Sequence, residues 1–253
     1  MSLGLGVGFY GLGGSDVVSK LSPIGIAAGN LAMWLQFDTG ITSNESDEVS
    51  KWNDQSGNNR HASQGTDANK AALSNGALDF ERDNSDHYDF TKIDIADNGG
   101  FCVAVVVTRE SDTSGCLLSD NASELFQINN TSTLRVKTRN NTTATDTTTD
   151  AVFESGTFPT STKFLLLVNR TAGAANRFTF FKNGTQLTPD TDNSTNEANG
   201  ENPSGIEFSV LGSKAGSTNY FDGLVHDVAV WDTSLSTQQI VDVNNYFKEI
   251  HNL

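Results

Sequence analysis

The sequence is poor in cysteine, methionine, proline and positive charge. Its 253 residues include two Cys, two Met, four Pro and 16 Lys plus Arg against 31 Asp plus Glu, for a formal net charge of −15. Binding to nucleic acid depends on clustered cations that displace phosphate counterions, so this charge excludes a nucleic-acid partner and disfavours an anionic membrane surface. No apolar run approaches the roughly 18 residues of a membrane span, which excludes insertion by a helix.

The two cysteines are expected to be free, buried thiols. Cys102 lies in an apolar run and Cys116 follows a turn, and a hairpin between these segments separates the two residues by about 23 Å at roughly 3.3 Å per residue. A disulfide needs Cα atoms within about 7 Å. Unpaired thiols are typical of a reducing compartment. No Lys or Arg precedes Lys20, so the basic region of a secretory signal is lacking and no cleavable export signal is expected.

Residues 1–30 differ from the rest of the chain. Glycines alternate with apolar side chains, and Asp16 and Lys20 are the only charged residues. Ordering so many glycines costs backbone entropy, yet the apolar residues are unsuited to a solvated linker. Two interpretations stay open: an anchoring arm that docks on a partner, and an arm folded back on its own domain. The side chains expected to anchor the arm are Leu3, Leu5, Val7, Phe9, Tyr10 and Leu12.

From residue 31 onward, short apolar segments separated by polar turns predict an all-β domain. Asn183-Gly184 predicts a two-residue hairpin turn, since both residues tolerate positive φ. Residues 101–107 and 164–168 are apolar on both faces, so loops, the terminal helix or a neighbouring subunit must cover the face that the opposite sheet leaves free. The expected strands are 33–37, 49–52, 77–80, 88–90, 101–108, 125–128, 134–137, 164–169, 178–182, 206–211 and 224–231.

One helix is predicted over residues 236–250. Ser236 is its N-cap, and Gln239 completes a capping box. An apolar stripe at spacings of three and four predicts that the helix packs on the sandwich. The stripe consists of Ile240, Val243, Phe247 and Ile250. The polar stretches 131–150 and 188–203 are expected to be exposed loops.

Motifs for catalysis and cofactors give no support to an enzyme. Residues 6–11 match G-x-G-x-x-G by letter, but lack the strand before and the helix after that aim amides at a pyrophosphate. The nearest string to the Glu-x-Asp-x-Glu of sandwich glucanases has Lys92 and Ala96 in place of the glutamates. We therefore expect no enzyme, no cofactor and no metal. The four histidines are scattered and expected at the surface or at strand edges; they are His61, His87, His226 and His251.

Two acidic loops contain oxygen ligands that calcium prefers. The Asp83–Asp89 turn crowds three Asp and one Asn, and Asp190–Glu201 imitates an EF-hand loop with Thr195 where that loop needs glycine. Solvated turn carboxylates are the favoured interpretation, and calcium binding stays open for both loops.

The aromatic residues suggest one place for a sugar to stack. Trp34, Trp52 and Trp231 lie within apolar strand patterns, so burial in the core is expected for all three. Tyr220 and Phe221 follow a Gly-Ser-Thr-Asn turn. We expect them to be an exposed pair that contacts a glycan.

Two stretches resemble the concanavalin A-like, laminin-G-type jelly-roll family. One is a tryptophan strand around Trp34 followed by Trp52-Asn53-Asp54-Gln55-Ser56-Gly57; Leu78–Tyr88 matches the next element of the pattern imperfectly. The other is Phe221-Asp222-Gly223 leading to Val230-Trp231-Asp232, before the terminal helix. The resemblance covers both ends of the domain. It implies a two-sheet antiparallel jelly-roll sandwich over residues 31–253, with an extended N-terminal arm.

Within this family, the chain is similar to proteins of tailed bacteriophages in two features. One is the element Asn-Asp-Gln-Ser-Gly-Asn, and the other is the preceding Met-Ser-Leu-Gly-Leu-Gly start. This similarity implies a non-enzymatic virion structural protein, a capsid decoration or tail appendage made in the host cytoplasm and anchored by residues 1–30. Its implied partners are other virion proteins and further copies of itself, with a host glycan as a secondary partner. The alternative is a carbohydrate-binding, lectin-like module without catalytic activity, because this fold serves many functions.

Overall fold

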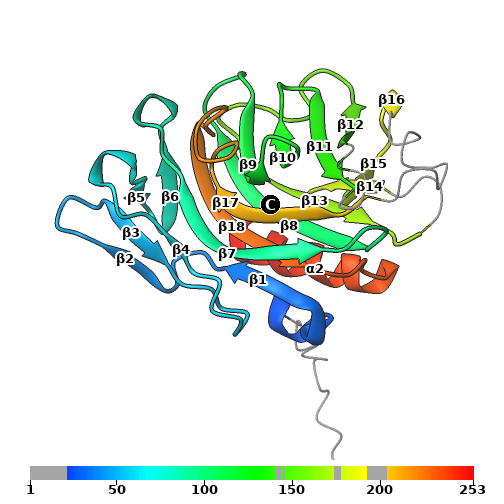
Figure 1. Cartoon of the computed structure of the whole chain (residues 1–253), viewed down its shortest axis with the longest axis horizontal. Helices are drawn as coiled ribbons and strands as arrows, with labels where there is room; N and C mark the ends of the chain where they lie inside the picture. Colours follow the sequence, from blue (N-terminus) through cyan, green and yellow to red (C-terminus); the bar gives the residue numbers. More distant parts are fainter. Residues whose placement is uncertain (1–21, 141–143, 145, 174–177, 193–203) are drawn as a thin grey trace, which may run out of the picture.

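The structure is a computed structural model that describes residues 22–140, 144, 146–173, 178–192 and 204–253. Within these residues the strands form two antiparallel sheets, of eight and ten strands, that pack face to face (Figure 1). One α-helix, α2 (Thr237–His251), lies against the eight-stranded sheet. The expected two-sheet sandwich with a C-terminal helix is confirmed. In the described part of the chain, no helix has the length and apolar character needed to cross a bilayer.

The eight-stranded sheet has three long strands at its centre. The central strand β8 pairs antiparallel with β13 on one side and with β18 on the other. The spatial order is β15 (Thr185–Leu187), β14 (Phe178–Lys182), β13 (Lys163–Arg170), β8 (Phe101–Arg109), β18 (Gly223–Trp231), β6 (Ala77–Phe80) and β5 (Ala72–Ser74), with β1 (Leu31–Leu35) paired to β18. The β14–β15 turn has Asn183 at φ 48° and Gly184 at φ 82°, which confirms the predicted hairpin.

The ten-stranded sheet forms the other layer. Its spatial order is β16 (Thr191–Asp192), β12 (Asp146–Val152), β11 (Thr133–Arg139), β10 (Glu124–Ile128), β9 (Gly115–Asn121), β17 (Ile206–Leu211), β7 (Tyr88–Ile95), β4 (Ala62–Ser63), β3 (Val49–Trp52) and β2 (Ile41–Ser43). Short 3₁₀ turns precede or connect strands: η1 (Pro23–Gly25), η2 (Ala28–Asn30), η3 (Asp67–Asn69) and η4 (Arg82–Asn84).

The main core lies between the two sheets. Phe101 of β8 packs edge-on against Phe208 of β17, which joins the two layers through their aromatic rings. Trp52, Phe126 and Phe164 are fully buried in the same core. Each large apolar side chain buried in this way stabilises the fold by about 1.5–3 kcal/mol. The two-residue period of the strands directs alternate side chains into this core and the others outward.

A second apolar cluster covers the outer face of the eight-stranded sheet. Cys102, Ala104 and Val106 of β8 face Val243 and Phe247 of α2 there. The terminal helix, one of the three expected covers, therefore covers the strands that the sequence showed to be apolar on both faces. The capping box is also present, because the Ser236 hydroxyl accepts the amide of Gln239, whose side chain accepts the amide of Ser236.

The end of the expected N-terminal arm packs on this same face. Residues 22–30 form η1 and η2, Ile26 is buried, and its carbonyl accepts the indole N–H of Trp231 at 2.8 Å. Residues 1–21, with all six expected anchoring side chains, lie outside the described residues.

Two sequence-based expectations about strands are wrong. The hairpin that was assumed between Cys102 and Cys116 does not form, since β8 and β9 lie in different sheets; both thiols are nevertheless free and buried. The stretch 131–150 is mostly strand, because β11 and β12 pair along their whole lengths. Thr147 and Thr149 are buried, and threonine suits this position because its β-branched side chain favours strands.

Candidate functional site: a polar network on the ten-stranded sheet

The outer face of the ten-stranded sheet carries a row of cations on β11. Leu134, Val136 and Thr138 are buried, so the alternate residues Arg135, Lys137 and Arg139 lie on the opposite side of the strand. These three are notable in a chain with only 16 basic residues. The strand period alone explains their alignment on one face.

Carboxylates of the neighbouring strand β12 pair with this row. Arg135 makes two hydrogen bonds of 2.7 Å to the two oxygens of Asp150, a bidentate geometry that fixes both side chains. Asp146 lies 3.0 Å from Arg139 and 3.5 Å from Lys137. Partial burial acts to raise the pKa of Asp146, but hydrogen bonding and the two cations hold that pKa below its ordinary value.

An acidic group lies beside the row, on β9, β10 and β17. Glu124 is buried, with 1% of its surface exposed; its two oxygens accept the backbone amide of Glu207 at 3.0 Å and the side-chain amide of Asn121 at 2.7 Å. Asn121 also donates to Asp120 at 3.1 Å. Glu207 pairs with Lys92 of β7 at 2.9 Å. Burial raises the pKa of Glu124, the Asn121 hydrogen bond opposes that rise, and the charges of Glu207 and Asp120 add to it.

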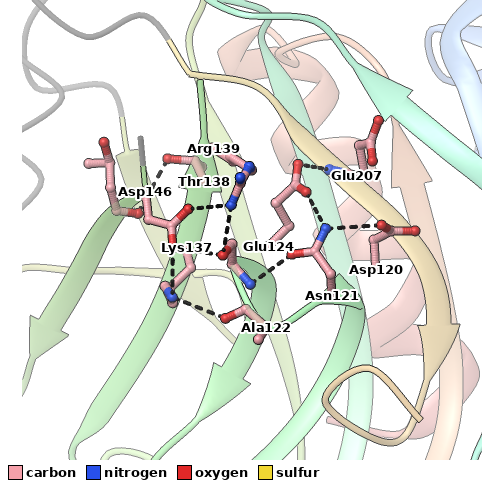
Figure 2. A network of polar contacts seen from close by, with 11 residues as sticks. Asp120, Asn121, Ala122, Glu124, Lys137, Thr138, Arg139, Asp146 and Glu207 are labelled. Atoms are coloured by element: carbon pink, nitrogen blue, oxygen red, sulfur yellow. Dashed lines mark hydrogen bonds and ion pairs between the residues drawn. The ribbon is translucent and has the colours of Figure 1, made fainter. Parts of the chain in front are cut away.

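The β9–β10 turn joins the two groups (Figure 2). The Ser123 hydroxyl donates to Asp146 at 2.7 Å and accepts from Arg139 at 3.1 Å. Lys137 donates to the carbonyl of Ala122 at 3.0 Å. Asn121 also accepts the backbone amide of Ser123 at 2.7 Å, which links the acidic group to the turn. The Arg135–Asp150 pair lies beside these contacts on β11 and β12. Residues of six strands and the turn make up this surface, which we call the polar network: Lys92, Asp120, Asn121, Ser123, Glu124, Arg135, Lys137, Arg139, Asp146, Asp150, Glu207 and Ser209. Such a surface offers fixed donors and acceptors to a polyhydroxylated ligand.

The acidic part of the polar network has the oxygen ligands that a hard cation prefers. Carboxylate oxygens of Asp120, Glu124 and Glu207 lie within 4.8 Å of one another. Both oxygens of Glu124 already accept N–H groups, and the Lys92 ammonium already neutralises Glu207. A cation at this position would have to compete with these donors.

In the described residues, the Asp83–Asp89 turn, one of the two loops for which calcium binding stayed open, does not gather its oxygens. Asp86 is buried and accepts the Glu81 amide at 2.8 Å, whereas Asp83 and Asp89 are exposed. Among the described residues the other acidic trio is Asp79, Glu81 and Glu110, which only borders that turn. Most of the Asp190–Glu201 loop lies outside the described residues.

The expected aromatic pair is divided between surface and core. Phe221 has 1% of its surface exposed and packs edge-on against Phe80, so the expectation of exposure is wrong for this residue. It follows a loop whose next strand begins at Gly223, and it turns inward to fill the core. Tyr220 is half-buried beside His87, with 6.0 Å between ring centroids, and its hydroxyl donates to Gly216. Trp34, Trp52 and Trp231 are buried, as predicted.

The loop that carries Tyr220 borders the polar network. The Ser119 hydroxyl donates to the carbonyl of Ser213 at 2.8 Å and accepts the amide of Ala215 at 3.0 Å. Ser119 immediately precedes Asp120 of the polar network. The loop that carries Tyr220 is therefore hydrogen-bonded to β9, the strand that also holds Asp120 and Asn121 of the polar network. His87 was not expected to have an aromatic neighbour.

A separate polar cluster lies under α2 and has a structural role. Asp227 of β18 accepts the indole N–H of Trp34 at 3.1 Å and pairs with His251 of α2 at 2.6 Å. His226 lies 3.2 Å from the Thr108 hydroxyl. Burial raises the pKa of Asp227, although its bond to His251 opposes the rise. His226 and His251 are both buried, so the expected surface location is wrong for these two histidines.

Sequence reasoning missed the polar network as a site. The alternation of Arg135, Lys137 and Arg139 was visible in the sequence, but their carboxylate partners come from strand β12, in a stretch expected to be loop. The acidic residues come from three strands that are distant in sequence, and only the sheet order brings them together.

The sequence model of the family described as the concanavalin A-like lectin/glucanases superfamily matches residues 82–241. The chain belongs to this family. No curated protein matches the sequence.

Solved structures show the same fold at low sequence identity. Trypanosoma rangeli sialidase in complex with sialic acid superposes with a TM-score of 0.55 at 14% identity, over 89% of this chain and 34% of that chain. The binding domain of Paraclostridial Mosquitocidal Protein 1 has a TM-score of 0.50 at 15% identity, over 87% of this chain and 53% of that chain. This chain therefore spans about a third of the sialidase, and the likeness concerns the fold alone.

Proposed function

We propose that this chain is a carbohydrate-binding module and that its ligand lies on the outer face of the ten-stranded sheet. The observation that carries the proposal is the polar network, which presents carboxylate, amide, hydroxyl, guanidinium and ammonium groups on one face of a lectin/glucanase-family sandwich. Binding sites combine a few precisely placed polar groups with a supporting scaffold, and those on strands are held more rigidly than those on loops.

The arrangement of the acidic groups supports binding without catalysis. Glycosidases place two carboxyl groups roughly 5–10 Å apart, one of them free to donate a proton. The oxygens of Glu124, Asp120 and Glu207 approach within 4.8 Å of one another, and both oxygens of Glu124 are held by N–H donors. Glu124 is thus suited to fix the β9–β10 turn against β17. We propose that the module is not an enzyme.

The first test is retention of glycans by the full chain. The wild-type protein is applied to an array of neutral and acidic oligosaccharides, and the dissociation constant of a retained glycan is measured by calorimetry. Arg139→Ala and Asp146→Ala each remove a side chain of the polar network, and we expect binding at least about tenfold weaker, or about 1.4 kcal/mol. Asp242→Asn, a charge change on α2, is the matched control and should leave binding unchanged.

Two results would contradict the proposal. One is a wild-type protein that retains no oligosaccharide. The other is equal affinity in the wild type and in both polar-network variants. The non-catalytic part has its own test: hydrolysis of a retained glycan that disappears in Glu124→Gln would show an enzyme.

The bacteriophage role implied by the sequence resemblance remains a prediction. In this role the chain is a capsid decoration or a tail appendage, and its partners are neighbouring virion proteins and other copies of this chain. The support is the uncharged, glycine-rich sequence of residues 1–14, which the acidic domain follows. A glycan-binding face and a virion location are compatible. Mass spectrometry of purified particles tests the location, and absence of the chain from them would contradict it.

A further inference from the structure

A pocket of about 340 Å³ lies on the helix-covered face of the sandwich. It sits between the beginning of α2 and the strands β13, β14 and β15. Leu235, Ile240 and Val241 line it from the helix side, and Phe181 and Gln186 line it from the hairpin β14–β15. The volume is at the small end of ligand pockets, roughly 300–1,000 Å³, and is sufficient for one or two large side chains.

The pocket has no charged residue in its lining, although the whole chain carries a net charge of −15. Its polar residues are uncharged amides and hydroxyls, such as Gln186 and Thr237 at the rim. Apolar walls suit a hydrophobic side chain. The amides and hydroxyls suit the backbone N–H and C=O groups that any peptide brings with it. The lining is therefore matched to an uncharged, apolar peptide.

Exposed apolar side chains gather on this same face. Among the described residues, the large hydrophobic side chains left exposed are Ile24 of η1 and Val241 and Ile250 of α2, with exposed fractions of 51%, 44% and 47%. All three belong to the elements that cover the eight-stranded sheet. Val241 itself lines the pocket.

One segment of the sequence has the uncharged, apolar chemistry that this lining suits. Residues 1–14 have no charged side chain, and Phe9 and Tyr10 are their largest side chains. Glycines on either side of this pair, at positions 8 and 11, leave its backbone free of bulky neighbours. The other segments outside the described residues, 141–143, 145, 174–177 and 193–203, contain no aromatic residue and no Leu, Ile, Val or Met.

The described structure begins on the same face as the pocket. Residues 22–30 pack on β1 and β18, and Ile26 belongs to the same apolar cluster as Leu235 and Ile240 of the pocket. The 13 residue-to-residue steps from Phe9 to Ser22 reach up to about 43 Å when the chain is extended. This exceeds the length of α2, whose 15 residues span about 22 Å. A short tether also gives an effective concentration in the millimolar range.

We propose that this pocket receives the Phe9-Tyr10 pair of the chain's own N-terminal segment. The pair fills the apolar volume between Phe181 and Ile240, and the flanking glycines bring the backbone close to the uncharged rim. The segment is then held on the face opposite to the polar network.

Disulfide trapping in the full chain tests the position of the segment. Gly11→Cys keeps Phe9 and Tyr10 intact and is combined with Gln186→Cys at the rim of the pocket. Cys102 and Cys116 have no exposed surface and do not compete. The matched controls combine Gly11→Cys with Ile250→Cys at the far end of α2, or with Thr91→Cys, which is exposed on β7 of the other sheet. All variants are oxidised mildly at low micromolar concentration.

The proposal predicts that the 11–186 pair forms an intramolecular disulfide at least tenfold faster than either control pair. Adding Phe9→Ala and Tyr10→Ala should reduce that rate to the control level, with an unchanged Tm. Equal rates for all three pairs would overturn the proposal. A disulfide found only in dimers would overturn it too, and would assign the pocket to a second copy.

Discussion

The outer face of the eight-stranded sheet is apolar and covered by α2, whereas the outer face of the ten-stranded sheet carries the polar network. On the covered face, Cys102 and Val106 of β8 meet Val243 and Phe247 of the helix. On the other face, the side chains of β11 that point away from the core are cations, and their ion pairs with Asp146 and Asp150 are partly exposed. The same strand period thus produces two surfaces of opposite character.

This difference indicates how the fold divides stability from recognition. Burial of apolar area stabilises in proportion to that area, so the covered face contributes to folding. Half-exposed ion pairs contribute about 0–1 kcal/mol each, because solvent screens them and their side chains lose entropy. The ten-stranded face can therefore change its side chains at little cost to the fold, which suits a surface that selects a ligand.

The largest expected effect comes from opening the covered face. Phe247 is fully buried between α2 and the sheet. Phe247→Ala removes its packing and leaves a cavity, so we expect the free energy of unfolding to fall by about 3–5 kcal/mol. Urea denaturation measures this value. A loss below about 1 kcal/mol would show that α2 contributes little to the fold.

Breaking the buried pair beneath the helix should come next. Asp227→Ala leaves the indole N–H of Trp34 and the His251 ring without their acceptor, in a region that water does not reach. We expect a loss of about 2–4 kcal/mol, since unpaired buried polar groups retain their desolvation cost. Asp232→Ala, next to the same strand but exposed, is the control for the denaturation experiment. Equal losses in the two variants would contradict this account.

Acid should weaken the covered face before the polar one. Burial, with the charges of Lys163 and His251, lowers the pKa of His226 to about 3, whereas an unfolded histidine titrates near 6.5. Between these values the unfolded chain binds a proton that the folded protein does not, so stability falls as the pH drops from about 6.5 towards 3.

In the polar network, the pKa of Asp146 is also lowered, but this carboxyl group titrates at lower pH than an unfolded histidine because its ordinary pKa is about 4. The lowered pKa of Asp146 contributes stability above about pH 4 that is lost only on further acidification. Denaturation at several pH values should therefore show a decline from pH 6.5, on the order of 2–3 kcal/mol by pH 4. His226→Gln should flatten that decline, and an unchanged slope in this variant would assign the decline to other groups.

The smallest effect on stability is expected on the polar face. Arg135→Ala removes the bidentate pair with Asp150, whose side chain is about a quarter exposed. We expect a loss of unfolding free energy below about 1 kcal/mol, together with weaker glycan binding. Thermal unfolding and calorimetry of the same variant separate the two properties. A large loss of stability without a change in binding would reverse the roles of the two faces.

The sequence predicted the parts of the fold that local patterns control. The helix end at Ser236, the Asn183-Gly184 turn and the burial of the three tryptophans follow from short-range chemistry, and all are confirmed. The pairing of β9 was wrong, since a hairpin with the Cys102 strand was expected and β9 pairs instead with β10 and β17, as the sheet order sets. Polar strand β12 was missed because its threonines resemble loop composition.

The candidate site was less predictable than the fold. Glu124 and Glu207 are separated by 83 residues in the sequence, and their contact depends on strands that pair across the whole sheet. His226 and His251 were similarly placed at the surface, although α2 and β18 enclose them. Tyr220 was located by its turn, but its neighbour Phe221 was expected outside and lies inside. A turn pattern does not tell which of two adjacent aromatic side chains faces the core.

The most direct test is hydrogen–deuterium exchange, measured without ligand and with a saturating concentration of a glycan that the array retains. It tests whether the ligand binds the outer face of the ten-stranded sheet and not the face covered by α2. We predict slower exchange in residues 119–124, 133–139 and 206–209, which hold the polar network, and unchanged exchange in α2. Arg139→Ala should remove this protection at the same glycan concentration. Protection confined to α2 and β13–β15, with none on the ten-stranded sheet, would contradict the account.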